Sequence, residues 1–427
     1  MSDKIGLRDA ISIGVGGMVG GGIFAVLGLA VSLSRGGTPL AFLFAGMLAL
    51  ITSYSYVKLS NKFADRGGTV KFINQCFGET IFSGGINNLL WVSYIIMLSL
   101  YASAFGSYAP NLFAFTGGEM NFHIYASGII ILASIINYYS IKVVGKIESY
   151  AVIIKLMILL GFIGIGIYGL VGNPNLEQLS PEKWEAPLRI LSGGMVIFVA
   201  YEGFELIANS APDIKNPEKN IARAYYISII FVVLLYIVIA VVTVGSLPFD
   251  KIKTAEDYVL AEAAKPMLGQ TGFTIITIAA LISTFSAINA SLYGGSRVSY
   301  EIAEDDELPH QFTYQLWNQP IGLLITAILT LTLTNTLELE SISTAGSVGF
   351  LLIFAIVNYV GFKLSADTKG KKAIPIIGCI LCAIAVVVLL QQQYSSNKIG
   401  VITAVSIIAF CFLIEAIYKW TKKRKSS

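Results

Sequence analysis

The chain has 427 residues, of which 55% are hydrophobic and 13% charged, with a mean hydropathy of +0.73 and a net charge of +3. A soluble core of this size could not hide so much apolar surface, and the apolar runs have the length of a bilayer crossing, so the composition excludes a soluble globular protein. It predicts an all-α polytopic membrane protein and gives no reason to expect a nucleic-acid partner.

The apolar runs predict twelve transmembrane helices joined by short loops. Each run is close to the ~20 residues that a helix needs to cross a bilayer. The predicted spans lie near residues 8–33, 39–60, 83–113, 122–140, 146–171, 188–210, 221–246, 270–300, 320–337, 343–363, 373–392 and 398–419.

The distribution of basic residues predicts how these helices are oriented. With both termini on the cytoplasmic side, the inner segments hold 21 of the 29 Lys and Arg residues, the outer segments hold seven, and Lys155 is the one inside a span. Because cytoplasmic loops are enriched in Lys and Arg, this asymmetry favours a multi-pass protein of the plasma membrane with both termini cytoplasmic. It also supports an even number of spans.

Glycines interrupt two of the spans near mid-membrane. A bilayer tolerates a broken helix only beside a protected cavity. Because spans 1 and 6 each begin a five-span half, the pattern predicts an inverted repeat with a site between the two breaks. The predicted divisions are a first repeat at 1–180, a second repeat at 181–365, and two further helices with a basic tail at 366–427. The interrupting glycines are Gly14, Gly16, Gly17, Gly20, Gly21 and Gly22 in span 1 and Gly203 in span 6.

The two breaks have the chemistry to hold a zwitterion. Gly21 and Gly22 have no Cβ, so a carboxylate can approach the N–H groups that begin the second half of span 1, where the helix dipole favours a negative charge. Carbonyl groups at the end of the first half of span 6 suit an ammonium group. Close helix packing is the alternative interpretation, and it applies equally well to Gly14, Gly16 and Gly17.

Lys155 is the most informative single residue. It lies in the apolar run 150–160, about 15 Å along the helix from Gly145, near the middle of a ~30 Å hydrocarbon layer. An ionisable side chain at that depth is a functional candidate, because desolvation penalises its charged form. We therefore expect Lys155 to load and release a proton; a permanently charged lysine that serves as a strut is the alternative.

Three segments together resemble a known family, and the resemblance extends over nearly the whole chain. They are Gly20–Phe24, Phe198–Glu205 leading to Asp213–Ile221, and Gly294–Tyr300 followed by Glu304–Pro309. They are similar to the amino acid-polyamine-organocation (APC) permeases, and within them to prokaryotic proton-coupled amino acid transporters of broad specificity. The resemblance implies a leucine-transporter-type 5+5 fold and proton-coupled amino acid symport by alternating access. A sodium-coupled or exchange-mode amino acid or polyamine carrier of the same fold is the alternative.

The resemblance also implies which residues form the site. It places the substrate carboxylate on the N–H groups of Gly21 and Gly22. It places the substrate amine on the carbonyls of Met18, Val199 and Glu202. It places Lys155 where sodium-coupled relatives hold their ion. The implied substrate-binding residues are Met18, Gly20, Gly21, Gly22, Phe198, Val199, Tyr201, Glu202 and Gly203, and the implied proton-coupling residues are Lys155, Ser283, Thr284 and Ser286.

Glu202 departs from the family pattern, because relatives usually carry an apolar or small residue before this glycine. Three roles stay open for it: pairing with a cationic substrate side chain, acting as a second protonation site, or capping backbone N–H groups of the second half-helix.

The gate is a second departure. Val199 stands where many members place a bulky aromatic, so we expect Phe198 and Tyr201 to close the site instead. Aromatic residues of span 3 are expected either to shape the side-chain pocket or, more commonly on such a helix, to pack or face lipid. These residues are Trp91, Tyr94 and Tyr101.

The remaining features predict no further chemistry. Residues 254–265 resemble an amphipathic outer helix that ends before Pro266 and Gly269 and covers the vestibule, and residues 69–78 a short inner helix. Neither histidine lies in a catalytic motif, and the Cys379/Cys382 pair has no second pair, so we expect neither an enzyme nor a metal site. The expected partners are an amino acid substrate and the lipid bilayer, the driving force is a proton gradient without any cofactor, and the oligomeric state stays open.

Overall fold

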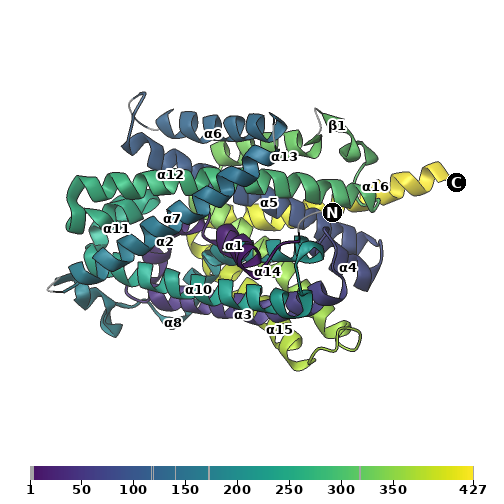
Figure 1. Ribbon diagram of the computed structural model, residues 1–427, viewed down its shortest axis with the longest axis horizontal. Helices are drawn as coiled ribbons and strands as arrows, with labels where there is room; N and C mark the ends of the chain where they lie inside the picture. The colour runs from purple at the N-terminus through teal and green to yellow at the C-terminus, as the bar shows by residue number, and fades with distance from the viewer. Residues whose placement is uncertain are drawn as a thin grey trace.

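The computed structural model describes residues 4–116, 118, 120–139, 141–171, 174–316 and 319–426, without the side chains of residues 141–149, 174 and 423–426. This part of the chain is almost entirely helical, with one short antiparallel hairpin (Figure 1). Several basic side chains counted in the orientation argument lie outside the described ones: Lys142, Lys146, Lys423, Arg424 and Lys425.

The α-helices are α1 Leu7–Met18, α2 Gly22–Ser34, α3 Thr38–Lys62, α4 Thr69–Phe77, α5 Ile81–Tyr108, α6 Met120–Tyr139, α7 Ile141–Gly169, α8 Pro187–Val196, α9 Leu206–Asn209, α10 Pro217–Ser246, α11 Phe249–Thr254, α12 Val259–Glu304, α13 Gly322–Thr336, α14 Leu339–Lys363, α15 Ala373–Ser396 and α16 Lys398–Ser426. The 3-10 helices are η1 Ala109–Asn111, η2 Pro174–Leu179, η3 Pro181–Lys183, η4 Phe198–Glu205, η5 Ala211–Asp213, η6 Glu256–Tyr258 and η7 His310–Thr313, and the hairpin pairs β1 Gln315–Leu316 with β2 Gln319–Pro320.

Most of the predicted spans have a helix of sufficient length and apolarity. Among the described residues, nine helices meet both conditions, and two bent pairs, α1 with α2 and α8 with the segment Phe198–Asn209, raise the number to eleven. Helix α13, at the position of the predicted span 320–337, has 15 residues and is therefore only ~22 Å long. The structure thus confirms a polytopic helical membrane protein, while the count of twelve stays a prediction.

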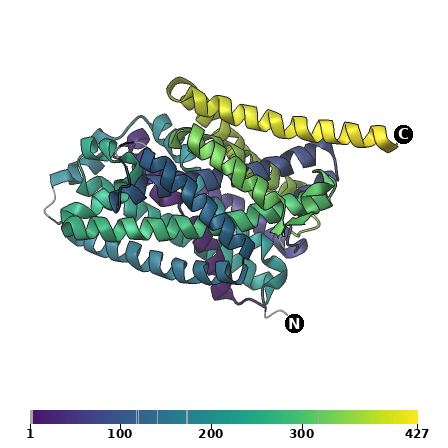
Figure 2. The same cartoon turned by 90° about the horizontal axis from the view of Figure 1, so that it is seen from above.

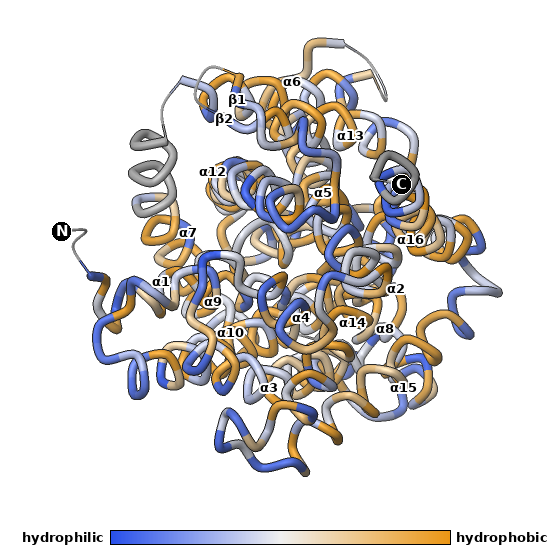
Figure 3. Tube along the Cα trace, turned by 90° about the vertical axis from the view of Figure 1, so that its right-hand side faces the viewer, coloured by the Kyte–Doolittle hydropathy of each residue, from blue (hydrophilic) through white to orange (hydrophobic). Residues whose placement is uncertain are grey.

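Burial separates central helices from peripheral ones. The share of buried residues in the most apolar window is 89% for α5 and 78% for α14, but 33% for α6 and 28% for α16. Seen along the bundle, α3, α6, α7, α15 and α16 lie on the perimeter (Figure 3), and α16 runs along one edge with its end projecting beyond its neighbours (Figure 2). The perimeter exposes apolar side chains such as Ile131, Leu160 and Ile402, as a helix facing hydrocarbon requires.

Local sequence signals set several helix boundaries. Thr80 begins α5 with a reciprocal capping box to Ser83, and Pro217 lies in the first turn of α10, where its missing N–H costs nothing. The short helix predicted at 69–78 is confirmed as α4. The outer helix predicted to end before Pro266 and Gly269 is confirmed at Gly269 and wrong at Pro266: α12 runs through Pro266, and its helical geometry breaks at Gly269, whose φ of 59° suits a residue without a Cβ.

Candidate functional site

The first span is broken where the glycine triplet predicts. Helix α1 ends at Met18, α2 begins at Gly22, and the two axes are bent by 46°. The first N–H groups of α2 have no acceptor inside the helix. They are thus available at the positive end of the α2 dipole, deep in the bundle, where α2 residues from Gly22 to Val31 are buried.

The second break has a different form from the one expected. Helix α8 ends at Val196 and the chain bends by 44°, but residues 198–205 continue as the 3-10 helix η4 instead of uncoiled main chain. The carbonyl of Val196, expected to be free, accepts hydrogen bonds from Ser343 Oγ at 2.8 Å and Ser347 Oγ at 2.7 Å. Serines of α14 therefore satisfy this one carbonyl, while the expectation that other carbonyls of the break receive an amine stays a prediction.

The two broken spans touch through their glycines. A Cβ added to Gly17 would lie 2.6 Å from the Gly203 carbonyl oxygen, and one added to Gly203 would overlap the main chain of Gly17. A Cβ on Gly14 would meet Ser228, and one on Gly16 would meet Val152. Close packing, the alternative stated for the early glycines, is therefore confirmed for Gly14, Gly16 and Gly17, and it applies to Gly203 as well.

Gly203→Ala should be strongly destabilising, because neither backbone at this contact can move as a flexible side chain could. Overpacking of this kind costs about 1–3 kcal/mol, and we expect a fall of several degrees in the apparent Tm of the purified protein. Gly161→Ala is the matched control, since nothing lies within 4 Å of a Cβ at that helical position. An unchanged Tm in Gly203→Ala would contradict the close contact.

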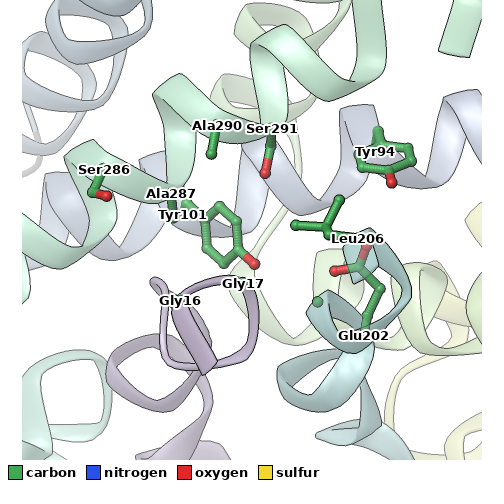
Figure 4. A pocket seen from close by; sticks show the side chains of 11 residues that line it. Gly16, Gly17, Tyr94, Tyr101, Glu202, Leu206, Ser286, Ala287, Ala290 and Ser291 are labelled. Carbon is green, nitrogen blue, oxygen red and sulfur yellow. The ribbon is translucent and has the colours of Figure 1, made fainter. Parts of the chain in front are cut away.

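A small cavity of about 10 Å3 lies beside this contact, enough for roughly one water molecule. Figure 4 shows its lining residues, which come from α1, α5, η4, α9 and α12. Of the predicted site residues, Glu202, Gly203 and Ser286 line it. The remaining lining residues are Gly16, Gly17, Tyr94, Tyr101, Leu206, Ala287, Ala290 and Ser291.

The aromatic residues of span 3 divide between the two roles left open for them. Tyr94 and Tyr101 line the cavity, and the Tyr101 ring lies directly against Gly21, so that a Cβ there would overlap it. Trp91 instead packs inside the bundle, where its Nε1 donates to Thr326 Oγ1 at 3.0 Å. Tyr101 thus covers the N-terminus of α2, the place where the sequence predicts a bound carboxylate.

Met18, Val199, Tyr201 and Phe198 do not line this cavity. The Met18 carbonyl accepts a hydrogen bond from Tyr236 at 2.7 Å, and the Val199 N–H donates to Ser347 Oγ at 3.1 Å. Tyr201 donates to the Phe42 carbonyl at 2.9 Å, and Phe198 packs on Phe354. Neither Phe198 nor Tyr201 lines this cavity, whereas Tyr101 does, and which aromatic residue closes the site stays a prediction.

Lys155 is buried and reaches the first break. Its side chain is 1% exposed, and Nζ donates to the Gly16 carbonyl at 3.1 Å. Ser283 of α12 holds the next carbonyls, donating to Gly20 at 2.5 Å and to Val19 at 3.2 Å. Thr284 bonds back to Ala280 in its own helix. Helices α7 and α12 therefore hold the broken segment of span 1 between Lys155 and Ser283.

Two buried carboxyl groups lie on the other broken span. Glu202 is 4% exposed and Glu205 2%, and their side chains contact each other. Among the described residues, no backbone N–H donates to Glu202, so the capping role left open for it is not seen. Two contacting carboxyl groups in a medium of low dielectric resist simultaneous ionisation.

Glu205 connects η4 with three other helices. Its carboxylate accepts hydrogen bonds from Tyr94 of α5 at 2.7 Å, Tyr56 of α3 at 3.3 Å and Thr69 of α4 at 3.4 Å. Sequence analysis recognised the acid but could not find these partners, which are distant in sequence. One missed signal was available: small residues recur in α12 at 283, 286, 287, 290 and 291, the spacing of a single helix face.

The architecture defines a class before any comparison is made: a polytopic membrane protein whose buried polar residues surround two broken helices, the arrangement of a secondary transporter. The family model for "Amino acid permease" matches residues 5–417. The chain is 33% identical over 425 residues to "Uncharacterized protein MJ0609" of Methanocaldococcus jannaschii, covering 99% of this chain and 97% of that protein.

Two further relatives have more informative names. The "Inner membrane transport protein YbaT" of Escherichia coli is 31% identical over 98% of this chain and 97% of its own length. The "Serine/threonine exchanger SteT" of Bacillus subtilis is 24% identical over 87% of this chain and 85% of its own length. This chain belongs to the amino acid permease family, which confirms the APC resemblance. It is a transporter and not an enzyme.

Proposed function

We propose that this protein is a proton-coupled amino acid symporter of the plasma membrane that works by alternating access, with Lys155 carrying the coupled proton. The observation that carries the proposal is the hydrogen bond from the buried Lys155 Nζ to the Gly16 carbonyl, in the last turn before the first break. Amino acids are proposed as substrates because the family model and the Bacillus subtilis relative carry those names.

The coupling has a simple physical basis. A protonated lysine is a strong donor, so it binds the Gly16 carbonyl and attaches α7 to the broken span. A neutral lysine attracts that carbonyl less, which lets α1 move away from α7. Proton binding then biases an equilibrium between two conformations by its differential affinity for them. The Ser283 contacts with Val19 and Gly20 hold the opposite side of the same segment.

Substrate binding requires a change from the conformation described here. A cavity of about 10 Å3 is far smaller than an amino acid, and Tyr101 lies against Gly21. We propose that outward movement of Tyr101 exposes the N–H groups of Gly21 and Gly22 to the substrate carboxylate. The carbonyls of Met18, Val199 and Glu202 are proposed to receive the amine; a carbonyl oxygen has two lone pairs, and the Met18 oxygen accepts a hydrogen bond from Tyr236 with one of them.

The remaining parts of the proposal concern topology. Twelve spans, a 5+5 inverted repeat divided at residues 180 and 365, and cytoplasmic termini all follow from the sequence. In support, the C-terminal end of α16 lies at the end of the bundle that carries α4 and the hairpin, and the described chain begins on that side, while α11 lies at the opposite end (Figure 1). That arrangement fits an even number of crossings.

A proteoliposome uptake panel tests the function. Purified protein is supplied with neutral, acidic and basic amino acids and with polyamines, each with and without an inward proton gradient and with and without sodium. We expect amino acid accumulation that the proton gradient drives, that a protonophore abolishes, and that sodium leaves unchanged. Uptake that follows sodium would instead support the sodium-coupled alternative, and strict dependence on internal amino acid would support exchange.

Glu202→Gln belongs in the same panel, because it separates the two roles that the structure leaves for this acid. A loss confined to basic substrates, by about tenfold in kcat/KM, indicates that Glu202 pairs with a cationic side chain. An equal loss for all substrates, with a changed pH profile, indicates a second proton site. Glu185→Gln is the control, since Glu185 is an acid in a surface ion pair with Arg35 and Arg189. Wild-type behaviour of Glu202→Gln would remove both roles.

A further inference from the structure

A buried carboxylate joins two walls of the central cavity at the end of the bundle that carries α4. Helices α5 and α12 both line that cavity. Residues 305–307 follow α12 directly and lie against the first two turns of α5, where Glu307 is completely buried. Its carboxylate accepts hydrogen bonds from Ser83 Oγ at 2.9 Å and from Asn87 Nδ2 at 2.5 Å. Glu307 therefore holds the end of α12 on α5.

Helix α16, which lies outside the two predicted repeats, packs on α5 at the same place. The contact is close, because a Cβ added to Gly84 of α5 would overlap the Glu415 carboxyl group of α16. Glu415 is also completely buried, and its Oε2 accepts a hydrogen bond from Asn88 Nδ2 at 3.4 Å. The same nitrogen donates to the main-chain carbonyl of Glu307 at 3.4 Å. One side chain of α5 thus binds both α16 and the segment after α12.

Two lysines in the last turns of α16 complete the attachment. Lys422 Nζ lies 2.8 Å from the Asp306 carboxylate, and Lys419 Nζ lies 3.5 Å from that of Glu415. Lys419 also donates to the main-chain carbonyl of Glu79, just before α5, at 2.5 Å. We call this group of side chains the latch; its members are Asp306, Glu307, Glu415, Lys419 and Lys422.

The closed latch contains groups that water would satisfy better. Glu307 and Glu415 are completely buried carboxyl groups, and taking such a group out of water is costly. The Oδ1 atoms of Asn87 and Asn88 are enclosed without a hydrogen-bond partner among the described residues, which is costly as well. Asp306 has a left-handed φ of 57°, uncommon for a residue other than glycine. Opening would hydrate these groups and free this backbone, which offsets the hydrogen bonds that are lost.

The outermost contact of the latch is easily broken. The side chains of Lys422 and Asp306 are 53% and 52% exposed, and an exposed ion pair contributes little to stability in water. The end of α16 projects beyond its neighbours (Figure 2), so breaking this pair leaves it free to move away from the segment 305–307.

We propose that the latch is a releasable closure. It holds α5 and α12 together while the central cavity is shut, and the last turns of α16 leave the segment 305–307 before this end of the bundle opens. The proposal rests on the proposed transport function, because alternating access is what requires this end to open. Glu307 is then a positioning residue for α12, the helix whose Ser283 holds the broken segment of span 1.

Reversible cross-linking tests whether the latch opens during transport. Asp306→Cys and Lys422→Cys are combined in a background where all four natural cysteines are replaced by Ala. The two thiols are joined by 1,4-butanediyl bismethanethiosulfonate, and dithiothreitol removes the bridge. In proteoliposomes we expect the bridge to lower the initial rate of amino acid uptake at least about tenfold, because it blocks a required conformational step. Dithiothreitol should restore the rate in the same sample.

Glu262→Cys with Lys265→Cys is the matched control for the reagent. These two residues form an ion pair of 2.7 Å within α12, so a bridge between them joins no second element. Uptake by this variant should be the same before and after the bridge forms. The single variants Asp306→Cys and Lys422→Cys, treated with the same reagent, should also keep their uptake rates.

Labelling of a buried thiol tests the latch without requiring transport. Ser83→Cys, in the same cysteine-free background, places the thiol at a completely buried position beneath the latch. Lys419→Ala with Lys422→Ala should speed its reaction with N-ethylmaleimide at least about tenfold, because labelling follows the population of the open form. Lys419→Arg with Lys422→Arg keeps both charges and should label slowly. Glu182→Gln, an exposed acid outside the latch, should change nothing.

Unchanged uptake after bridging would overturn the proposal and show that α16 is a fixed support. Inhibition that dithiothreitol does not reverse, or that the control pair shows equally, would also count against it. So would labelling of Ser83→Cys that the alanine variant does not accelerate. If the wild type transports no amino acid, the proposed function fails, while the labelling result still decides whether α16 holds this end closed.

Discussion

Lys155→Ala should abolish proton-driven accumulation while leaving substrate exchange measurable. The variant removes the only amine that reaches the Gly16 carbonyl in the described structure, so protonation can no longer attach α7 to the broken span. We expect the accumulation ratio under an inward proton gradient to fall at least tenfold, to about the equilibrium value. Counterflow, which needs substrate binding but no net proton movement, should persist. Full pH-driven uptake by this variant would reject the coupling role.

Lys155→Arg separates coupling from a structural strut. Arginine keeps a positive charge and can still donate to Gly16, but it does not lose its proton at working pH. If Lys155 is a strut, this variant retains proton-driven accumulation. If Lys155 carries the proton, accumulation is lost although the protein keeps close to its wild-type Tm. Recovery of gradient-driven uptake in the arginine variant would therefore favour the strut.

Glu205→Ala should weaken the packing of α4 and α5 against η4. The Glu205 carboxylate accepts hydrogen bonds from Tyr94 and Thr69, which tie η4 to α5 and α4. Removal leaves buried donors unpaired, at about 1–3 kcal/mol for each group. We expect the initial uptake rate to fall below about one tenth of wild type. In a Cys379→Ala background we also expect maleimide to label the half-buried Cys76 of α4 faster.

Glu205→Gln is the matched variant, because its side-chain oxygen can still accept from Tyr94. We expect it to keep most of the thermal stability and the slow labelling of Cys76. Wild-type transport and wild-type Cys76 labelling in Glu205→Ala would show that these hydrogen bonds do not hold α4 against η4. The same defect in both variants would mean that the negative charge is what matters.

The broken helices show how much could be predicted from the local sequence. The Gly20–Gly22 triplet lowers helix propensity at one place in an apolar run, and the bend between α1 and α2 lies there. The same reasoning placed the second break in the segment Phe198–Glu205, and the bend lies at Ile197, directly before that segment, which then forms η4. Gly203 is needed for contact with Gly17. Sequence alone cannot distinguish a glycine that breaks a helix from one that lets two helices touch.

The site shows the same division between local and long-range causes. Lys155 could be recognised because placing a charged side chain in the hydrocarbon layer costs free energy whichever way the side chain points. Its contact with Gly16, and the Ser283 contacts beside it, join residues more than 130 positions apart. One cavity is lined both by η6 and by the segment between α13 and α14. Hydrophobic periodicity along the sequence could not predict that these two segments lie side by side.

By itself, the sequence determined that this chain is a helical membrane protein, where its first span breaks and which basic side chain lies buried, because hydropathy, glycine content and charge act on each helix separately. Only the tertiary structure decided that Tyr101 covers Gly21, that Glu205 joins four segments, and that Glu307 holds the end of α12 on α5. Those features come from packing between helices, where the position of each side chain depends on neighbours far away in the chain.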